Sequence, residues 1–98
     1  MTTNKESQEY ILDRLGMPDD VTTRPMMGEY LLYFRGTLIG GIYDGQLLLK
    51  ETSSNSQYNL KQVIPYSTAK RTMYLVEDFN DKTKLKEIVL ATYVELAK

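Results

Sequence analysis

The chain has 98 residues, of which 42% are hydrophobic and 26% are charged. These proportions are ordinary for a globular protein and exclude a disordered or fibrous chain, while the length suits one compact domain. The formal net charge of -1 opposes direct nucleic-acid binding. Because the sequence contains neither Cys nor His, it lacks disulfides, thiolate metal sites and the commonest catalytic base, so we expect no metal and no cofactor.

The chain carries no recognisable targeting or membrane segment. Residues 1–6 are polar rather than a basic region followed by an apolar run, as a signal peptide requires. The sequence contains no run of eighteen apolar residues, which is about the length needed to cross a bilayer. We therefore expect a cytoplasmic protein.

The first predicted element is a helix over residues 4–15. Thr3 and Glu6 match the S/T-x-x-E capping box, in which each side chain satisfies a backbone N–H of the first turn. Leu15 closes an apolar stripe that also contains Ile11, and Gly16 then provides a left-handed stop.

Four strands are expected next, over residues 21–27, 29–34, 37–43 and 46–50. Pro25 lacks a backbone N–H and therefore restricts the first strand to an edge, a strand start or a bulge. The other three are rich in Tyr, Phe, Leu and Ile and are separated by short glycine-containing turns, which predicts an antiparallel meander. Asp44-Gly45 is typical of a two-residue type I′ turn, because both residues tolerate a positive φ.

The second half begins with polar residues 52–57, which predict a surface loop. Leu60, Val63 and Ile64 have helical spacing and predict a short helix or turn. Another strand is expected over residues 72–76.

A final helix, capped by Asp78 or Asn80, completes the prediction. Its apolar positions follow the i, i+3, i+4, i+7 rule: Leu85, Ile88, Val89, Thr92, Tyr93 and Leu96. The predicted fold class is α+β, with an antiparallel sheet of about four to five strands flanked by N- and C-terminal helices. All 98 residues are expected to form a single domain.

The strand pattern also predicts an interaction surface. With two-residue turns, Tyr30 lies opposite Gly41 and Leu32 opposite Ile39, although a bulge at Gly36 would shift this register by one residue. One face, which we name the tyrosine face, then collects Tyr30, Leu32, Phe34, Ile39, Tyr43 and Leu48. The other face is equally apolar, and the helices can cover one face of the sheet but not both. We expect the tyrosine face to bind a second copy of the chain or another protein.

Other candidate features have simple structural explanations. Gly40 and Gly41 inside a strand indicate a bulge or a close helix approach, with the alternative that the bare backbone approaches a bound ligand. Lys70-Arg71, with tyrosines nearby, could contact a nucleic-acid strand, but two charges make a weak patch. Met26-Met27 is interpreted as core filler.

Three segments together resemble a known family. They are Arg24-Pro25-Met26-Met27-Gly28-Glu29-Tyr30-Leu31-Leu32-Tyr33, Gly40-Gly41-Ile42-Tyr43-Asp44-Gly45 and Leu47-Leu48-Leu49-Lys50. The sequence resembles the N-terminal domain of the TfoX (Sxy) family of bacterial competence regulators. The motif positions are Met26, Met27, Gly28, Glu29, Tyr30, Tyr33, Gly40, Gly41, Asp44, Gly45 and Lys50.

The resemblance implies a small α+β domain and no known catalytic residues. Long members of the family carry a second, helical domain and promote transcription of competence genes together with a cyclic-AMP receptor protein. Residues 1–98 are not expected to contain that second domain, so competence regulation is not carried over. We expect a non-enzymatic interaction or regulatory module that acts through the tyrosine face. The alternative is a small-ligand-binding protein or minor enzyme with a pocket near Gly40 and Gly41.

Overall fold

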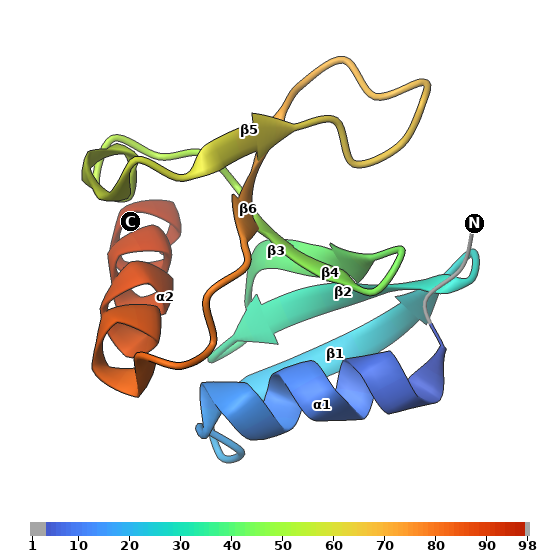
Figure 1. Cartoon of the computed structure of the whole chain (residues 1–98), viewed down its shortest axis with the longest axis horizontal. Helices are drawn as coiled ribbons and strands as arrows, with labels where there is room; N and C mark the ends of the chain where they lie inside the picture. Colours follow the sequence, from blue (N-terminus) through green and yellow to red (C-terminus); the bar gives the residue numbers. More distant parts are fainter. Residues whose placement is uncertain (1–3, 98) are drawn as a thin grey trace.

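The computed structural model describes residues 4–97, in which two α-helices flank a six-stranded antiparallel sheet (Figure 1). The strand order is β1-β2-β3-β4-β6-β5. The elements are α1 (Lys5–Leu15), β1 (Val21–Met26), β2 (Glu29–Phe34), β3 (Thr37–Tyr43), β4 (Gln46–Leu49), a 3₁₀ turn η1 (Ser56–Tyr58), β5 (Lys61–Val63), β6 (Met73–Val76) and α2 (Lys82–Leu96). The α+β class with its flanking helices is confirmed, and the described sheet has one strand more than the upper expectation.

Helix α1 begins at a side-chain cap and ends at a glycine. Thr3 of the predicted capping box lies outside the described residues, and Asn4 is the N-cap, with its Oδ1 accepting a hydrogen bond from the Ser7 N–H at 2.8 Å. Gly16 adopts a φ of 67°, which is the left-handed stop predicted for it. The end of this helix is therefore the predicted one, and its buried residues, Ile11 and Leu15, belong to the predicted apolar stripe.

The hairpin turns of the sheet share one geometry. Asp44 and Gly45 have φ values of 52° and 74°, so the positive φ predicted at both positions is confirmed. The same pair of positive values occurs at Met27-Gly28 and Arg35-Gly36. Each turn therefore spans two residues, which fixes where β2, β3 and β4 begin.

The pairing of β2 with β3 departs from the predicted register. Next to the turn the strands pair as expected, but a bulge then adds one residue to β3. Leu32 consequently pairs with Gly40 rather than with Ile39, and Tyr30 pairs with Ile42, one residue beyond its predicted partner. The bulge lies beside Gly40 and Gly41, and a bulge is one of the structures that this double glycine predicted.

The bulge also divides the predicted tyrosine face. Leu32, Phe34 and Ile39 are fully buried in the core beneath the helices, whereas Tyr43 and Leu48 lie in a separate cluster on the opposite face of the sheet. One inserted residue reverses the side-chain alternation of the rest of β3, and β4 follows β3 through its pairing. The prediction that the six side chains form one surface was therefore wrong.

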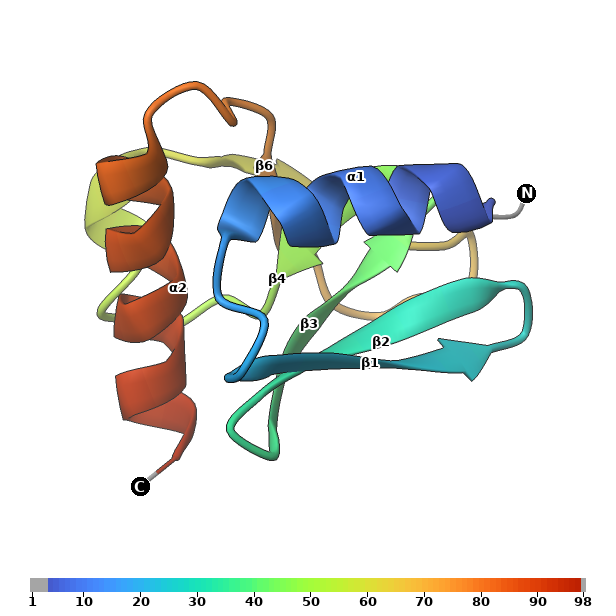
Figure 2. The ribbon, with the colours of Figure 1, turned by 90° about the horizontal axis from the view of Figure 1, so that it is seen from below.

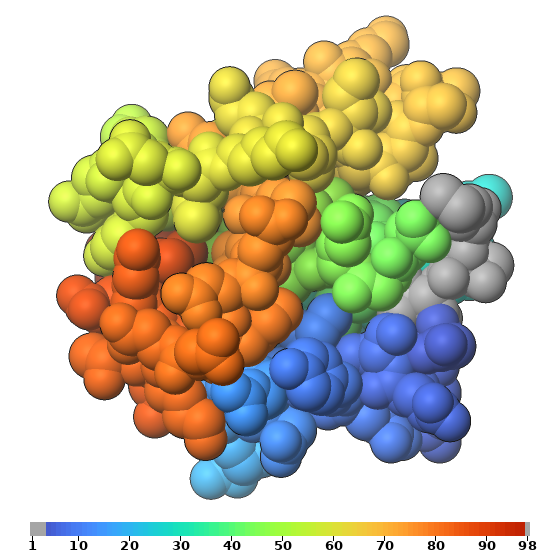
Figure 3. Space-filling model, in the orientation of Figure 1, coloured from blue at the N-terminus to red at the C-terminus, as the bar shows by residue number. Residues whose placement is uncertain are grey.

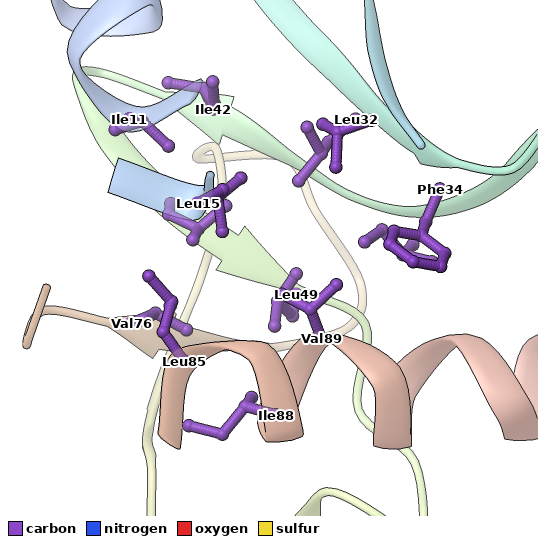
Figure 4. Close-up of a cluster of buried hydrophobic side chains, with 13 residues drawn as sticks. Ile11, Leu15, Leu32, Phe34, Ile42, Leu49, Val76, Leu85, Ile88 and Val89 are labelled. Atoms are coloured by element: carbon purple, nitrogen blue, oxygen red, sulfur yellow. The ribbon is translucent and has the colours of Figure 1, made fainter. Parts of the chain in front are cut away.

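The main core lies between the helices and one sheet face. Figure 2 shows α1 running alongside β1 and β2, with α2 beside the C-terminal end of α1. Figure 4 shows side chains of both helices pointing toward the strands. The buried cluster consists of Ile11, Leu15, Val21, Leu32, Phe34, Ile39, Ile42, Leu47, Leu49, Val76, Leu85, Ile88 and Val89. The predicted buried side of α2 is confirmed at Leu85, Ile88, Val89 and Thr92.

Two local predictions in the second half of the chain were wrong. Residues 61–63 form strand β5 instead of a short helix, because β6 offers an edge on which Val63 pairs with Met73. The N-cap of α2 is Asp81, whose Oδ1 accepts from the Lys84 N–H at 3.0 Å, rather than Asp78 or Asn80.

Residues 52–57 are more than a surface loop. The Asn55 side chain is fully buried and donates to the Lys50 carbonyl at 2.9 Å and to the Thr92 hydroxyl at 2.8 Å. Its Oδ1 accepts from the Thr52 N–H at 2.9 Å. These bonds attach the segment after β4 to α2, so the small polar residues of this stretch serve a buried network.

Candidate functional site

The sheet face opposite the helices, which we name the open face, carries no helix in the described part of the chain. Strand alternation places Leu31 and Tyr33 of β2 and Leu38 of β3 there, because their neighbours on β2 point into the helix-side core. Tyr43, Leu48 and Leu75 continue this face as a second buried cluster, with Val63 and Met73 packed against it. The open face is therefore apolar.

The connection between β5 and β6 stands over one part of the open face. In Figure 3 the yellow and orange residues of this region form a lobe above the green strands. The Tyr66 ring lies 6.3 Å from the Tyr43 ring, centroid to centroid. Between connection and sheet lies a groove of about 1080 Å³, lined by Leu31, Leu38, Gly40, Tyr43, Lys50, Glu51, Pro65, Tyr66, Thr68, Ala69, Lys70, Arg71, Thr72, Met73 and Leu96.

The double glycine is explained by close packing inside the sheet. A Cβ atom added at Gly40 would overlap the carbonyl oxygen of Leu48 on β4, and one added at Gly41 would lie 2.6 Å from the Tyr43 ring. The space beside both glycines is thus already occupied by the chain itself. The two glycines are therefore no reason to expect a small-ligand pocket against the backbone of β3, although Gly40 contributes to the groove wall.

The charge of the groove differs in sign from that of the chain. Its lining contains three of the twelve basic residues, Lys50, Lys70 and Arg71, but one of the thirteen acidic residues, Glu51. The lining therefore carries a formal charge of +2, while the rest of the chain carries -3. The Glu51 carboxylate accepts hydrogen bonds from the Gln62 amide and the Thr72 hydroxyl.

A further cation lies on the same face beyond the groove. The Arg24 guanidinium is 5.9 Å from the centroid of the Tyr33 ring, and Arg24 pairs with Leu31 across β1 and β2. Cations thus occur on the β1 side of the open face, at the end of β4 and on the β5–β6 connection. Sequence reasoning noticed Lys70-Arg71 as an isolated pair and could not place it near Lys50.

The motif residues at the other end of the sheet hold two turns together. Glu29 Oε1 accepts from the Asp44 N–H at 3.1 Å, which joins the start of β2 to the β3–β4 turn.

Burial raises the pKa of Tyr43, with smaller contributions from Tyr66 and Glu29. Met27 is 94% exposed at the first hairpin tip, so its interpretation as core filler was wrong, whereas Met26 is half-buried.

Comparison with known families gives a match over most of the chain. The family model described as the TfoX N-terminal domain matches residues 11–95. The chain belongs to the TfoX N-terminal domain family. Comparison with curated proteins and with solved structures gives no match.

Most motif residues of this TfoX N-terminal domain shape its framework. Gly28 and Gly45 occupy positive-φ turn positions, and Gly40 and Gly41 permit close packing in the sheet. Lys50 is exposed and lines the groove. Within residues 4–97, no three Asp, Glu, His or Cys side chains gather as metal ligands, and none of the described helices combines the length and apolarity needed to span a bilayer.

Proposed function

We propose that this TfoX N-terminal domain, acting as one domain over residues 1–98, is a non-enzymatic protein-interaction module that binds its partner through the open face. The observation that supports this most is an apolar sheet face without helical cover, with Leu31, Tyr33 and Leu38 half-buried on it. Exposed apolar patches flanked by polar groups are characteristic of protein-binding sites. A regulatory role is part of the proposal and is supported by the family resemblance, and a cytoplasmic location is proposed from the polar character of residues 1–6.

The dimensions of the groove support a protein partner over a small molecule. Ligand pockets have volumes of roughly 300–1,000 Å³ and enclose most of their ligand. The groove, at about 1080 Å³, lies just above that range and is bordered on one side by a connection rather than by a helix or strand. The groove therefore suits a segment of a partner protein, which can be a second copy or a different chain.

Site-specific photo-cross-linking in the native cell tests the proposal. A photoreactive phenylalanine derivative replaces Leu38 on the open face, and the matched control carries it at Leu90, which is 40% exposed on α2. We expect a discrete protein adduct from position 38 and none from position 90. An adduct with a second copy would identify a homodimer, and one of another mass a different partner. Absence of adduct at position 38, or equal adducts at both positions, would overturn the proposal.

A further inference from the structure

We propose that the occupant of the groove is an acidic protein segment that carries apolar anchor side chains; this inference rests on the proposed function and specifies the partner's chemistry. The proposal follows from the arrangement of charge and apolar surface on the open face. Its cations stand at the border of the groove, and its apolar side chains form the floor.

The cations are placed to contact one segment. Lys50 lies directly after β4, while Lys70 and Arg71 belong to the opposite wall, and all three are exposed. Arg24 extends the positive surface past Leu31 toward the β1 edge. A chain of net charge -1 that concentrates +2 in one groove attracts an acidic ligand there and repels a basic one.

The floor requires more than charge from its occupant. Leu31, Leu38 and Met73 line the groove between its basic walls and present aliphatic surface. An occupant must cover this surface to gain affinity from removing it from water, since exposed charge pairs alone contribute little. Leucine-type or aromatic anchors among carboxylates meet both requirements.

A nucleic-acid strand fits the same charges less well. Single-stranded nucleic acids bind to aromatic side chains on which bases stack. In the groove the Tyr43 and Tyr66 rings contact one another in a tilted arrangement, with centroids 6.3 Å apart and planes at 44°, and the remaining floor is aliphatic. The negative net charge of the chain opposes the long-range attraction that drives such binding. An acidic polypeptide is therefore the better partner.

A set of labelled peptides, measured by fluorescence anisotropy, tests the inference. The probe is a short peptide of alternating Glu and Leu. One companion replaces each Glu with Gln, a second replaces each Leu with Ser, and a single-stranded oligothymidine serves as the nucleic-acid probe. The protein is used intact as wild type, as the Lys70→Gln, Arg71→Gln double variant, and as the Lys84→Gln, Lys86→Gln control. The control removes two exposed lysine charges from α2, away from the groove.

We expect the Glu-Leu peptide to bind more tightly than either companion and to weaken with added salt. The Lys70→Gln, Arg71→Gln variant should bind about fivefold more weakly, which corresponds to two exposed charge pairs of ordinary strength, while the α2 control should change affinity by less than about twofold. Equal binding of the Gln-Leu peptide, tighter binding of oligothymidine, equal losses in both variants, or no peptide binding would each overturn the inference. An adduct from position 38 would still uphold the proposed function in those cases.

Discussion

The buried Asn55 network leads to a quantitative prediction for Asn55→Ala. The substitution removes three side-chain hydrogen bonds and leaves the Thr52 N–H and the Lys50 carbonyl without their partner. A buried group that loses its partner costs about 1–3 kcal/mol. With two such backbone groups, and with the Thr92 hydroxyl still bonded to the Ile88 carbonyl, we expect the free energy of unfolding to fall by about 3–4 kcal/mol.

Urea unfolding followed by circular dichroism measures this loss. In thermal unfolding the same loss corresponds to a midpoint lowered by about 12 °C or more. The control Gln57→Ala removes one exposed bond to the Ser54 carbonyl in the same segment and should change the free energy of unfolding by less than about 0.5 kcal/mol. A loss below about 1 kcal/mol for Asn55→Ala, or equal losses for both variants, would refute the assigned role of this network.

Three further predictions concern the sheet. Gly40→Ala should reduce the free energy of unfolding by about 3 kcal/mol or more because its Cβ overlaps β4. Gly36→Ala should reduce it by about 1 kcal/mol, because Gly36 has open space around it but a φ of 81°. Similar losses for the two variants in urea unfolding would contradict the packing argument. Phe34→Ala should lose about 3–5 kcal/mol in the same assay, since the ring is fully buried beneath the helices, and a loss under about 1 kcal/mol would place it on a surface. Because burial raises the pKa of Tyr43, the protonated hydroxyl stabilises the fold fully below about pH 10, and this stability is lost as pH rises through the raised pKa of the folded state. Wild type should therefore lose stability more steeply than Tyr43→Phe above about pH 10. Parallel curves of stability against pH for the two proteins would exclude the effect.

Local sequence was sufficient wherever one residue type decides the geometry. Gly16 ends α1, Asp44-Gly45 forms the predicted turn, and α2 buries the stripe that begins with Leu85. Each of these outcomes depends on backbone conformation or side-chain period within one segment. Such signals need no knowledge of the distant chain.

The predictions that were wrong depended on contacts between distant segments. The bulge in β3 lies beside Gly40, which packs closely against β4, and the bulge decides which side chains share a face. Strand β5 forms because an edge of β6 is available. Asn55 was predicted to lie in a surface loop because its hydrogen-bond partner Thr92 is 37 residues away in the sequence.

The candidate site was predicted in kind but not in composition. The expectation that the helices leave one apolar sheet face uncovered agrees with the structure, yet the face contains Leu31 and Leu38 in place of Leu32 and Ile39. The groove was not predictable, since it requires the β5–β6 connection, with Tyr66 on it, to stand over the sheet. Sequence proximity gave no indication of this arrangement.

Amide chemical-shift mapping tests the central claim most directly. The isotope-labelled protein is titrated with the Glu-Leu peptide, and the shifted amides are placed on the structure. Binding at the open face predicts that the largest changes occur at Leu31, Leu38 and Lys70, with small changes at Leu90 on the outer side of α2. Shifts concentrated on α1 or α2, with the open face unchanged, would contradict the account.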